Sequence, residues 1–252
     1  MKNVKVILWG LGAMGGGIGK MLTKKKGVDI VGAIDIGAKV GKSLYEVVPG
    51  IVKGDREDVI VGTPEEVIKP GVADIVVVCT NSFTKDVFDK LVFVMERGMN
   101  VITSAEEMAY PQAQEPELAK KLDEIAKKNG VSVMGTGINP GLIMDLLVVL
   151  WTAACEEVNH VTSRRVNSLS PFGPAVMEEQ GIGISVEEFN ERKANGTMAG
   201  HVGFAESTMM ICDALGWKWD DFGQDMEPIV TDVDRKSPYG FAAAGQVAGV
   251  AM

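Results

Sequence analysis

The sequence predicts an α/β fold, in which a doubly wound parallel sheet is followed by a second domain of the α+β class. Three observations predict it. Short β-rich apolar runs alternate with helical patterns in the first half of the chain, a dense cluster of glycines directly follows the first apolar run, and the alternation ends after Trp151. We therefore expect two domains, at residues 1–140 and 141–252.

The first domain is expected to contain six strands, each a short apolar run rich in valine and isoleucine. The strands are expected at residues 4–9, 30–35, 59–62, 74–80, 100–103 and from 131 onward. Helical patterns occur at residues 18–26, from 63, at 85–97 and at 116–130. This alternation is typical of parallel sheets, which bind ligands at the carboxyl ends of their strands.

The second domain has a different pattern. We expect a buried helix within residues 141–155, strands at 160–170, 228–237 and 246–252, and helices at 186–194 and 204–215. The chain stops inside the last expected strand, without a cap or a polar tail. This ending leads us to expect a second domain that is truncated at its C-terminus.

The glycine cluster fits the pattern GxGxxG at Gly10, Gly12 and Gly15, directly after a strand and at the start of a helix. The first glycine permits a tight turn, the second lets a pyrophosphate approach the backbone, and the third lets helix and strand pack closely. The helix N-terminus, with Ala13 and Met14, offers free N–H groups to the phosphates. A simple glycine turn is the alternative.

Asp35 favours the nucleotide interpretation because it closes the second strand, twenty positions after Gly15. A carboxylate there accepts hydrogen bonds from the adenosine ribose hydroxyls. Residues 1–140 are therefore predicted to form a Rossmann-type dinucleotide-binding domain. Asp35 repels a 2′-phosphate, which favours NAD, but Lys39 lies four residues on and could neutralise one, so NADP stays an alternative.

The fourth strand ends in three small polar residues, Thr80, Asn81 and Ser82. Such residues suit the ribose of the cofactor because they line it without blocking it. The alternative is that Asn81 and Ser82 only cap the next helix. The sequence leaves both interpretations open.

The fifth strand ends in two adjacent carboxylates, Glu106 and Glu107, where the first residues beyond the sheet face the cleft. The two side chains cannot both point the same way. Glu106 lies nearer the strand end, so we expect it to face the cleft. The alternative for either residue is a solvated glutamate in the first turn of a helix.

The sixth strand ends in a second glycine-rich loop, at residues 135–141, which surrounds Asn139 with three glycines and a proline. Packing alone explains such a loop poorly, so we expect a ligand to approach the backbone here. The N-terminus of the apolar helix that follows could bind a carboxylate.

In the second domain, alternation along the expected strand at 160–170 places Arg165 and Asn167 on one face. Arginine binds carboxylates through paired hydrogen bonds. His201 could contact a ligand, although a lone histidine is as often a satisfied surface or core residue.

Composition excludes several classes of function. The net charge of −9, from 25 basic and 34 acidic residues, disfavours nonspecific binding to nucleic acid or to an anionic membrane. No apolar stretch approaches the roughly 20 residues of a membrane-spanning helix. With 2 histidines and 3 widely spaced cysteines, we expect no metal site and a cytoplasmic location.

Several motifs together resemble one enzyme group. They are GLGAMGGGIGK at 10–20, TSAEEMAYP at 103–111, GTGINPGLIMD at 135–145, RRVN at 164–167 and DVDRKSPYG at 232–240. They are similar to the 2,4-diaminopentanoate dehydrogenases of ornithine fermentation and the related native amine dehydrogenases, whose nucleotide domain is like that of dihydrodipicolinate reductase. The resemblance covers essentially the whole chain, although members of the family are roughly a hundred residues longer.

The resemblance implies an oxidative deamination with a nicotinamide cofactor, for example of 2,4-diaminopentanoate to 2-amino-4-oxopentanoate and ammonia. It implies that Glu106 accepts a proton, since homoserine dehydrogenases carry a lysine at the similar position. It further implies that Arg165, Asn167 and His201 hold the substrate in the second domain, that Asn139 lies between cofactor and substrate, and that the protein is a homodimer.

Two alternatives stay open. One is another reductase on this scaffold, related to dihydrodipicolinate reductase or homoserine dehydrogenase. The two histidines lie 41 positions apart, which argues against dihydrodipicolinate reductases because these carry a histidine-rich signature. The other alternative is a non-catalytic nucleotide-binding fragment, which the early ending motivates.

Overall fold

The structure is a computed structural model that describes residues 2–171, 173–198 and 200–252. The chain forms two compact units. The first contains Met1–Asn159 and Ala205–Lys218, and the second contains His160–Phe204 and Trp219–Met252. The two units are defined by the contacts within each of them. That residues 1–140 bind the cofactor and residues 141–252 bind the substrate stays a prediction.

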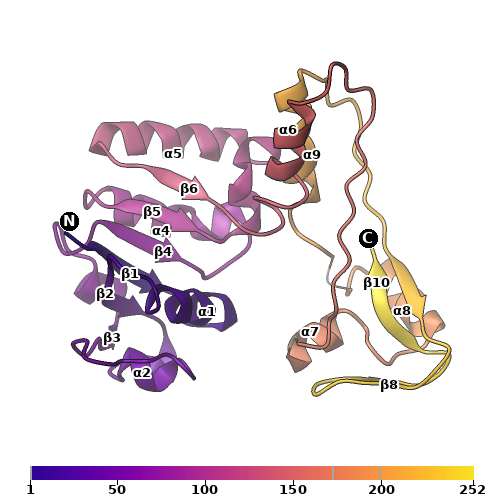
Figure 1. Cartoon of the computed structure of the whole chain (residues 1–252), viewed down its shortest axis with the longest axis horizontal. Helices are drawn as coiled ribbons and strands as arrows, with labels where there is room; N and C mark the ends of the chain where they lie inside the picture. Colours follow the sequence, from indigo (N-terminus) through magenta and orange to yellow (C-terminus); the bar gives the residue numbers. More distant parts are fainter. Residues whose placement is uncertain (1, 172, 199) are drawn as a thin grey trace. The chain divides into compact units, whose positions relative to one another are not determined.

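The first unit is built on a six-stranded parallel sheet, as predicted (Figure 1). Its strands lie in the order β3-β2-β1-β4-β5-β6. They are β1 (Val4–Trp9), β2 (Val28–Ile34), β3 (Val61–Gly62), β4 (Ile75–Val78), β5 (Asn100–Thr103) and β6 (Val133–Gly135). The order reverses between β1 and β4, and doubly wound sheets bind their ligands in the crevice at such a reversal.

Helices cover both faces of this sheet. They are α1 (Ala13–Leu22), α2 (Leu44–Val47), α3 (Pro64–Val67), α4 (Thr84–Met95) and α5 (Pro116–Asn129). The first unit also contains α6 (Leu146–Thr152), which lies beside α9 (Phe204–Leu215), and the short 3-10 turns η1 (Gly37–Lys39), η2 (Glu106–Ala109) and η3 (Pro111–Ala113) (Figure 1). Ile7 and Trp9 of β1 share a core with α4 and α5. Val6 and Leu8 face the opposite core, which includes residues of α1 and α2. The alternation along β1 therefore buries both faces.

The prediction of a helix at 18–26 was wrong at both ends, because α1 begins at Ala13 and ends at Leu22. Its glycines are compatible with a helix here because they bring it close to the sheet. A Cβ on Gly19 would lie 3.0 Å from Leu8 Cδ1. Close packing therefore offsets the low helix propensity of glycine.

The second unit contains two small antiparallel sheets. Its elements are α7 (Pro174–Glu179), α8 (Val186–Ala194), β7 (Glu227–Val230), β8 (Arg235–Lys236), β9 (Phe241–Ala242) and β10 (Val247–Ala251); β7 pairs with β10, and β8 pairs with β9. Phe189, Met198 and Val247 form its buried cluster. Helix α9 (Phe204–Leu215) lies almost entirely in the first unit.

Three expectations for this half of the chain were wrong. Residues 160–170 form no strand, because no neighbouring strand supplies backbone hydrogen bonds to them within the described residues. The strand expected at 228–237 is divided between β7 and β8. The helix expected within 141–155 is only α6, and it has no buried residue, with Trp151 71% exposed.

No helix among the residues that the structure describes is both long and apolar enough to cross a membrane.

Candidate active site

The turn between β1 and α1 has the geometry that the glycine pattern predicts. Gly10 has φ +95°, and a Cβ on it would lie 2.5 Å from the Cys79 carbonyl oxygen. A Cβ on Gly15 would lie 1.8 Å from the Gly10 carbonyl oxygen, whereas one on Gly12 would meet nothing within 4 Å. Gly10 and Gly15 therefore serve the turn and its packing, and the backbone at Gly12 is open to a ligand. This arrangement fits a dinucleotide pyrophosphate.

The N-terminus of α1 is also available to a phosphate. Gly12 is its N-cap and has no side chain to bond the first N–H groups, and the first turn carries no acidic residue. Gly12, Ala13 and Met14 are exposed, and Met14 is 63% exposed. The free N–H groups and the helix dipole therefore face solvent, where an anion would be bound.

Asp35 directly follows β2 and is bonded to the glycine turn. Its Oδ2 accepts hydrogen bonds from the Leu11 N–H and from Lys39 Nζ, both at 2.8 Å, and its Oδ1 accepts one from the Ile36 N–H at 2.7 Å. Lys39 Nζ also donates to the Leu11 carbonyl oxygen at 3.0 Å. Asp35 and Lys39 together hold the turn between β1 and α1.

These contacts decide the charge of Asp35. Burial is the largest influence and would by itself raise the pKa of this carboxyl. The hydrogen bonds from Lys39, Ile36 and Leu11 outweigh burial and lower the pKa below its ordinary value. Asp35 is therefore an anion at neutral pH, which suits an acceptor of ribose hydroxyl hydrogen bonds.

The residues after β4 lie beside the glycine turn, since Gly10 approaches Cys79 and Thr80. The capping alternative for Asn81 and Ser82 is wrong. The N-cap of α4 is Phe83, Asn81 Oδ1 accepts a hydrogen bond from Lys90 Nζ at 2.6 Å, and the Ser82 carbonyl oxygen accepts one from the Glu107 N–H at 3.1 Å.

The two glutamates after β5 differ in their surroundings. Glu107 is 8% exposed, and its Oε2 accepts a hydrogen bond from the Thr84 N–H, at the start of α4, at 2.7 Å. This bond satisfies one of the N–H groups that a helix leaves unpaired at its N-terminus. Glu106 is only partly buried, and among the described residues its carboxylate has no hydrogen bond or ion pair.

The glycines of the loop at 135–141 are packed closely against backbone atoms, and the expected approach of a ligand to this loop stays a prediction. A Cβ on Gly135 would lie 1.8 Å from the Met108 carbonyl oxygen, and one on Gly137 would lie 2.6 Å from the Pro140 carbonyl oxygen. Gly141 has φ +119°, which side chains rarely adopt. The role of Asn139 next to the cofactor stays a prediction.

The helix after this loop does not offer its N-terminus to a carboxylate ligand. Asp145 is the N-cap of α6 and is fully buried. Its Oδ1 accepts a hydrogen bond from the Leu146 N–H at 2.5 Å, and its Oδ2 accepts one from the Gly141 N–H at 2.7 Å. The chain's own carboxylate therefore occupies this position and joins the loop to α6.

Arg165, Asn167 and His201 belong to the second unit. Arg165 and Asn167 are exposed in an irregular segment, so the shared strand face that we expected for them is wrong. The ring of His201 lies 4.6 Å from that of Phe204, and the His201 carbonyl oxygen accepts a hydrogen bond from Gln224. Their roles toward a substrate stay predictions.

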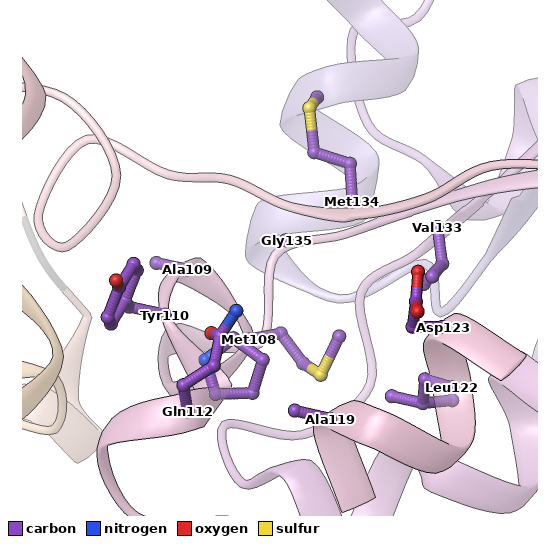
Figure 2. Close-up of a pocket in the computed structure, with 11 residues that line it drawn as sticks. Met108, Ala109, Tyr110, Gln112, Ala119, Leu122, Asp123, Val133, Met134 and Gly135 are labelled. Atoms are coloured by element: carbon purple, nitrogen blue, oxygen red, sulfur yellow. The ribbon is translucent and has the colours of Figure 1, made fainter. Parts of the chain in front are cut away.

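A pocket of about 300 Å³ lies between η2, η3, α5 and β6 (Figure 2). Met108 and Tyr110 line it from the turns, and Leu122 and Asp123 line it from α5. Met134 is half-exposed and points away from the other labelled side chains in Figure 2. The pocket contains none of the predicted site residues, so the candidate site rests on the strand ends.

Comparison with known proteins identifies the family. The chain is 66% identical to the 2,4-diaminopentanoate dehydrogenase of Acetoanaerobium sticklandii over 253 aligned positions, which cover 100% of this chain and 71% of that protein. The chain belongs to the 2,4-diaminopentanoate dehydrogenase family. Residues 142–252 also match the family described as the 2,4-diaminopentanoate dehydrogenase C-terminal domain.

The diaminopentanoate dehydrogenase family has a relative of known structure. The amine dehydrogenase of Mycobacterium smegmatis is similar over 99% of this chain and 73% of its own, with a TM-score of 0.71 and 26% identity. The predicted resemblance and fold class are thereby confirmed. The chain is an oxidoreductase, and its family implies a nicotinamide cofactor.

Proposed function

We propose that this chain binds NAD at the turn between β1 and α1 and uses it to deaminate 2,4-diaminopentanoate to 2-amino-4-oxopentanoate and ammonia. The observation that carries the proposal is that the two glutamates after β5 have different surroundings. Glu107 is bonded to α4, which leaves Glu106 available for chemistry. The substrate is proposed because the Acetoanaerobium sticklandii relative is a 2,4-diaminopentanoate dehydrogenase.

The bound cofactor supplies a hydride acceptor for the carbon that bears the amine. As this carbon loses its hydride, a carbon–nitrogen double bond forms in the substrate, and water then replaces the nitrogen. Each turnover consumes one water and one NAD and releases one ketone, one ammonia and one reduced cofactor. Glu106 accepts the proton that leaves the substrate ammonium and releases it to solvent. It then accepts the proton that leaves the attacking water and passes it to the departing nitrogen, so that ammonia leaves and the carboxylate is restored.

The remaining roles are proposed as follows. Gly10, Gly12, Ala13, Met14 and Gly15 hold the pyrophosphate, and Asp35 holds the adenosine ribose. Thr80, Asn81, Ser82 and Asn139 lie along the nicotinamide side of the cofactor. Arg165 binds the substrate carboxylate, with Asn167 and His201 on its other polar groups. We also propose a cytoplasmic homodimer.

The proposal is tested with purified protein, NAD and 2,4-diaminopentanoate. We expect reduced cofactor, followed by its absorbance, and ammonia to form in equal amounts. The Acetoanaerobium sticklandii relative serves as the positive control. If that relative is active while this chain binds NAD without turnover, the chain is a non-catalytic nucleotide-binding protein. Reduction without release of ammonia would indicate another dehydrogenase reaction.

Replacement of Asp35 by asparagine is expected to lower the preference for NAD over NADP at least about tenfold, measured as the ratio of the two kcat/KM values. The variant removes the charge that repels a 2′-phosphate and leaves Lys39 without its ion-pair partner at 2.8 Å. Asp29→Asn, near the opposite end of β2, is the matched control. An unchanged ratio for Asp35→Asn would show that Asp35 does not face the ribose.

A further inference from the structure

Helix α9 carries two adjacent buried polar residues, Glu206 and Ser207, which are 0% and 5% exposed. Glu206 Oε1 accepts a hydrogen bond from Gln114 Nε2 at 2.7 Å, and Ser207 Oγ donates one to Asp145 Oδ2 at 2.8 Å. Figure 1 shows α9 beside α6, which Asp145 caps. These bonds join α9 both to the segment after β5 and to the loop after β6.

A third contact joins α9 to the turn that carries the two glutamates. Tyr110 directly follows η2, and its hydroxyl donates a hydrogen bond to Asp213 Oδ2 at 2.5 Å. Burial, followed by the bond to Asp213, raises the pKa of Tyr110 to about 12. Tyr110 therefore keeps its proton and its donor role at ordinary pH.

The second oxygen of Glu206 is the unusual feature of this region. Within the described part of the chain, Oε2 is buried and has no hydrogen-bond partner. Burying a charged carboxylate with one oxygen unpartnered costs much more free energy than burying the neutral acid in the same place. Burial raises the pKa of Glu206, and the charge of Glu107 raises it further, against the opposing effect of the bond from Gln114.

Glu107 is the better place for the negative charge of this pair. Its carboxylate accepts the Thr84 N–H at the N-terminus of α4, where the helix dipole favours an anion. The negative charge of Glu107 adds to the effect of burial and raises the pKa of Glu206. The raised pKa and the unpartnered oxygen together favour the protonated form of Glu206.

We propose that Glu206 is a positioning residue for the active site: from α9, bonded to Gln114 and packed near Glu107, it fixes the turn that carries Glu106. This inference rests on the proposed function, in which Glu106 accepts a proton from the substrate amine. Glu206 acts through its neighbours and supplies a neutral side chain of the right shape. The glycine turn that binds the cofactor is independent of it.

The test compares Glu206→Leu with Glu206→Gln in the full chain. The leucine variant loses the bond to Gln114, so we expect kcat to fall between about tenfold and a hundredfold, as for a small displacement of a catalytic group. The Kd for NAD is expected to stay unchanged. The glutamine variant is neutral and keeps the bond to Gln114, so kcat is expected to stay within about threefold.

Ile211→Val is the matched control, because Ile211 lies on the same helix, is 9% exposed and makes no polar side-chain contact. Three results would overturn the proposal: an unchanged kcat in Glu206→Leu, an equal loss in Glu206→Gln, or an equal loss in Ile211→Val. The second would show that a charge is needed, and the third that helix packing alone matters.

A readout without activity separates this inference from the proposed function. Since the folded pKa of Glu206 lies above its ordinary value of 4.5, its stabilising contribution is full below pH 4.5 and is lost as pH rises through the folded pKa. As pH rises from 4.5 through the folded pKa, the Tm of the parent should therefore fall relative to that of Glu206→Gln. If the Tm difference between the two proteins does not change with pH, Glu206 is not protonated in the folded chain. This result is independent of whether the parent deaminates any substrate.

Discussion

Glu106→Gln is expected to lower kcat/KM for 2,4-diaminopentanoate by about 10²–10⁴-fold, the usual worth of a positioned general base. Glutamine cannot accept the proton from the substrate ammonium. Because Glu106 makes no hydrogen bond or ion pair with the described residues, its loss should leave Tm unchanged. Steady-state kinetics and thermal unfolding of the same preparation check both expectations.

Glu107→Ala should behave differently. The Thr84 N–H loses its acceptor at 2.7 Å, so the free energy of unfolding is expected to fall by about 1–2 kcal/mol, as for the loss of a helix cap. Glu124→Gln, which removes an exposed carboxylate from α5, is the control for charge alone. If Glu106→Gln lowers Tm as much as Glu107→Ala does, or if Glu106→Gln turns over at the parental rate, the assignment of the two glutamates is reversed.

Gly15→Ala is expected to abolish NAD binding and to lower the free energy of unfolding by about 3 kcal/mol. The added Cβ would lie 1.8 Å from the Gly10 carbonyl oxygen, so either α1 moves away from β1 or the turn opens. Both movements displace the N–H groups that would hold the pyrophosphate. Titration with NAD and denaturant unfolding measure the two effects.

Gly17→Ala is the matched control in the same helix. A Cβ on Gly17 would meet nothing within 4 Å, so alanine adds helix propensity without a clash. We expect the free energy of unfolding to rise by about 0.5–1 kcal/mol. Equal destabilisation by the two substitutions would show that the effect does not come from the contact with the Gly10 carbonyl oxygen, and the role given to Gly15 would be wrong.

The parallel sheet could be predicted from the sequence because a strand buried on both faces is a continuous apolar run. The runs at 4–9 and 100–103 coincide with β1 and β5. The glycine turn and Asp35 could also be predicted, because their spacing follows from the local path of a strand, a turn and a helix. Site residues whose positions depend on local sequence spacing can therefore be predicted from a single sequence.

Contacts between distant segments could not be predicted in this way. Glu106 and Glu107 are adjacent, and their position after the strand gave no sign of the bond that separates their roles: the Thr84 N–H, 23 positions earlier, donates only to Glu107. Glu206 and its partner Gln114 are 92 positions apart. The signal that was available is a charged residue inside an apolar stretch, which Asp145 and Glu206 both show.

The prediction of a strand at residues 160–170 was wrong for a related reason. Its alternating pattern suits a strand, but a strand needs a partner for its backbone N–H and C=O groups. Within the described residues it has none. The alternating pattern places Arg165 and Asn167 on one face only if the segment belongs to a sheet, and the pattern alone does not show that it does.

The most direct test of these assignments is a crystal structure of the chain with the reduced cofactor and 2,4-diaminopentanoate, a pair that cannot react. We predict that the Glu106 carboxylate accepts a hydrogen bond, at about 2.6–3.2 Å, from the ammonium on the carbon nearest the nicotinamide. Glu107 should still accept the Thr84 N–H. A structure in which Glu107 faces the nicotinamide and Glu106 points into solvent would contradict the account.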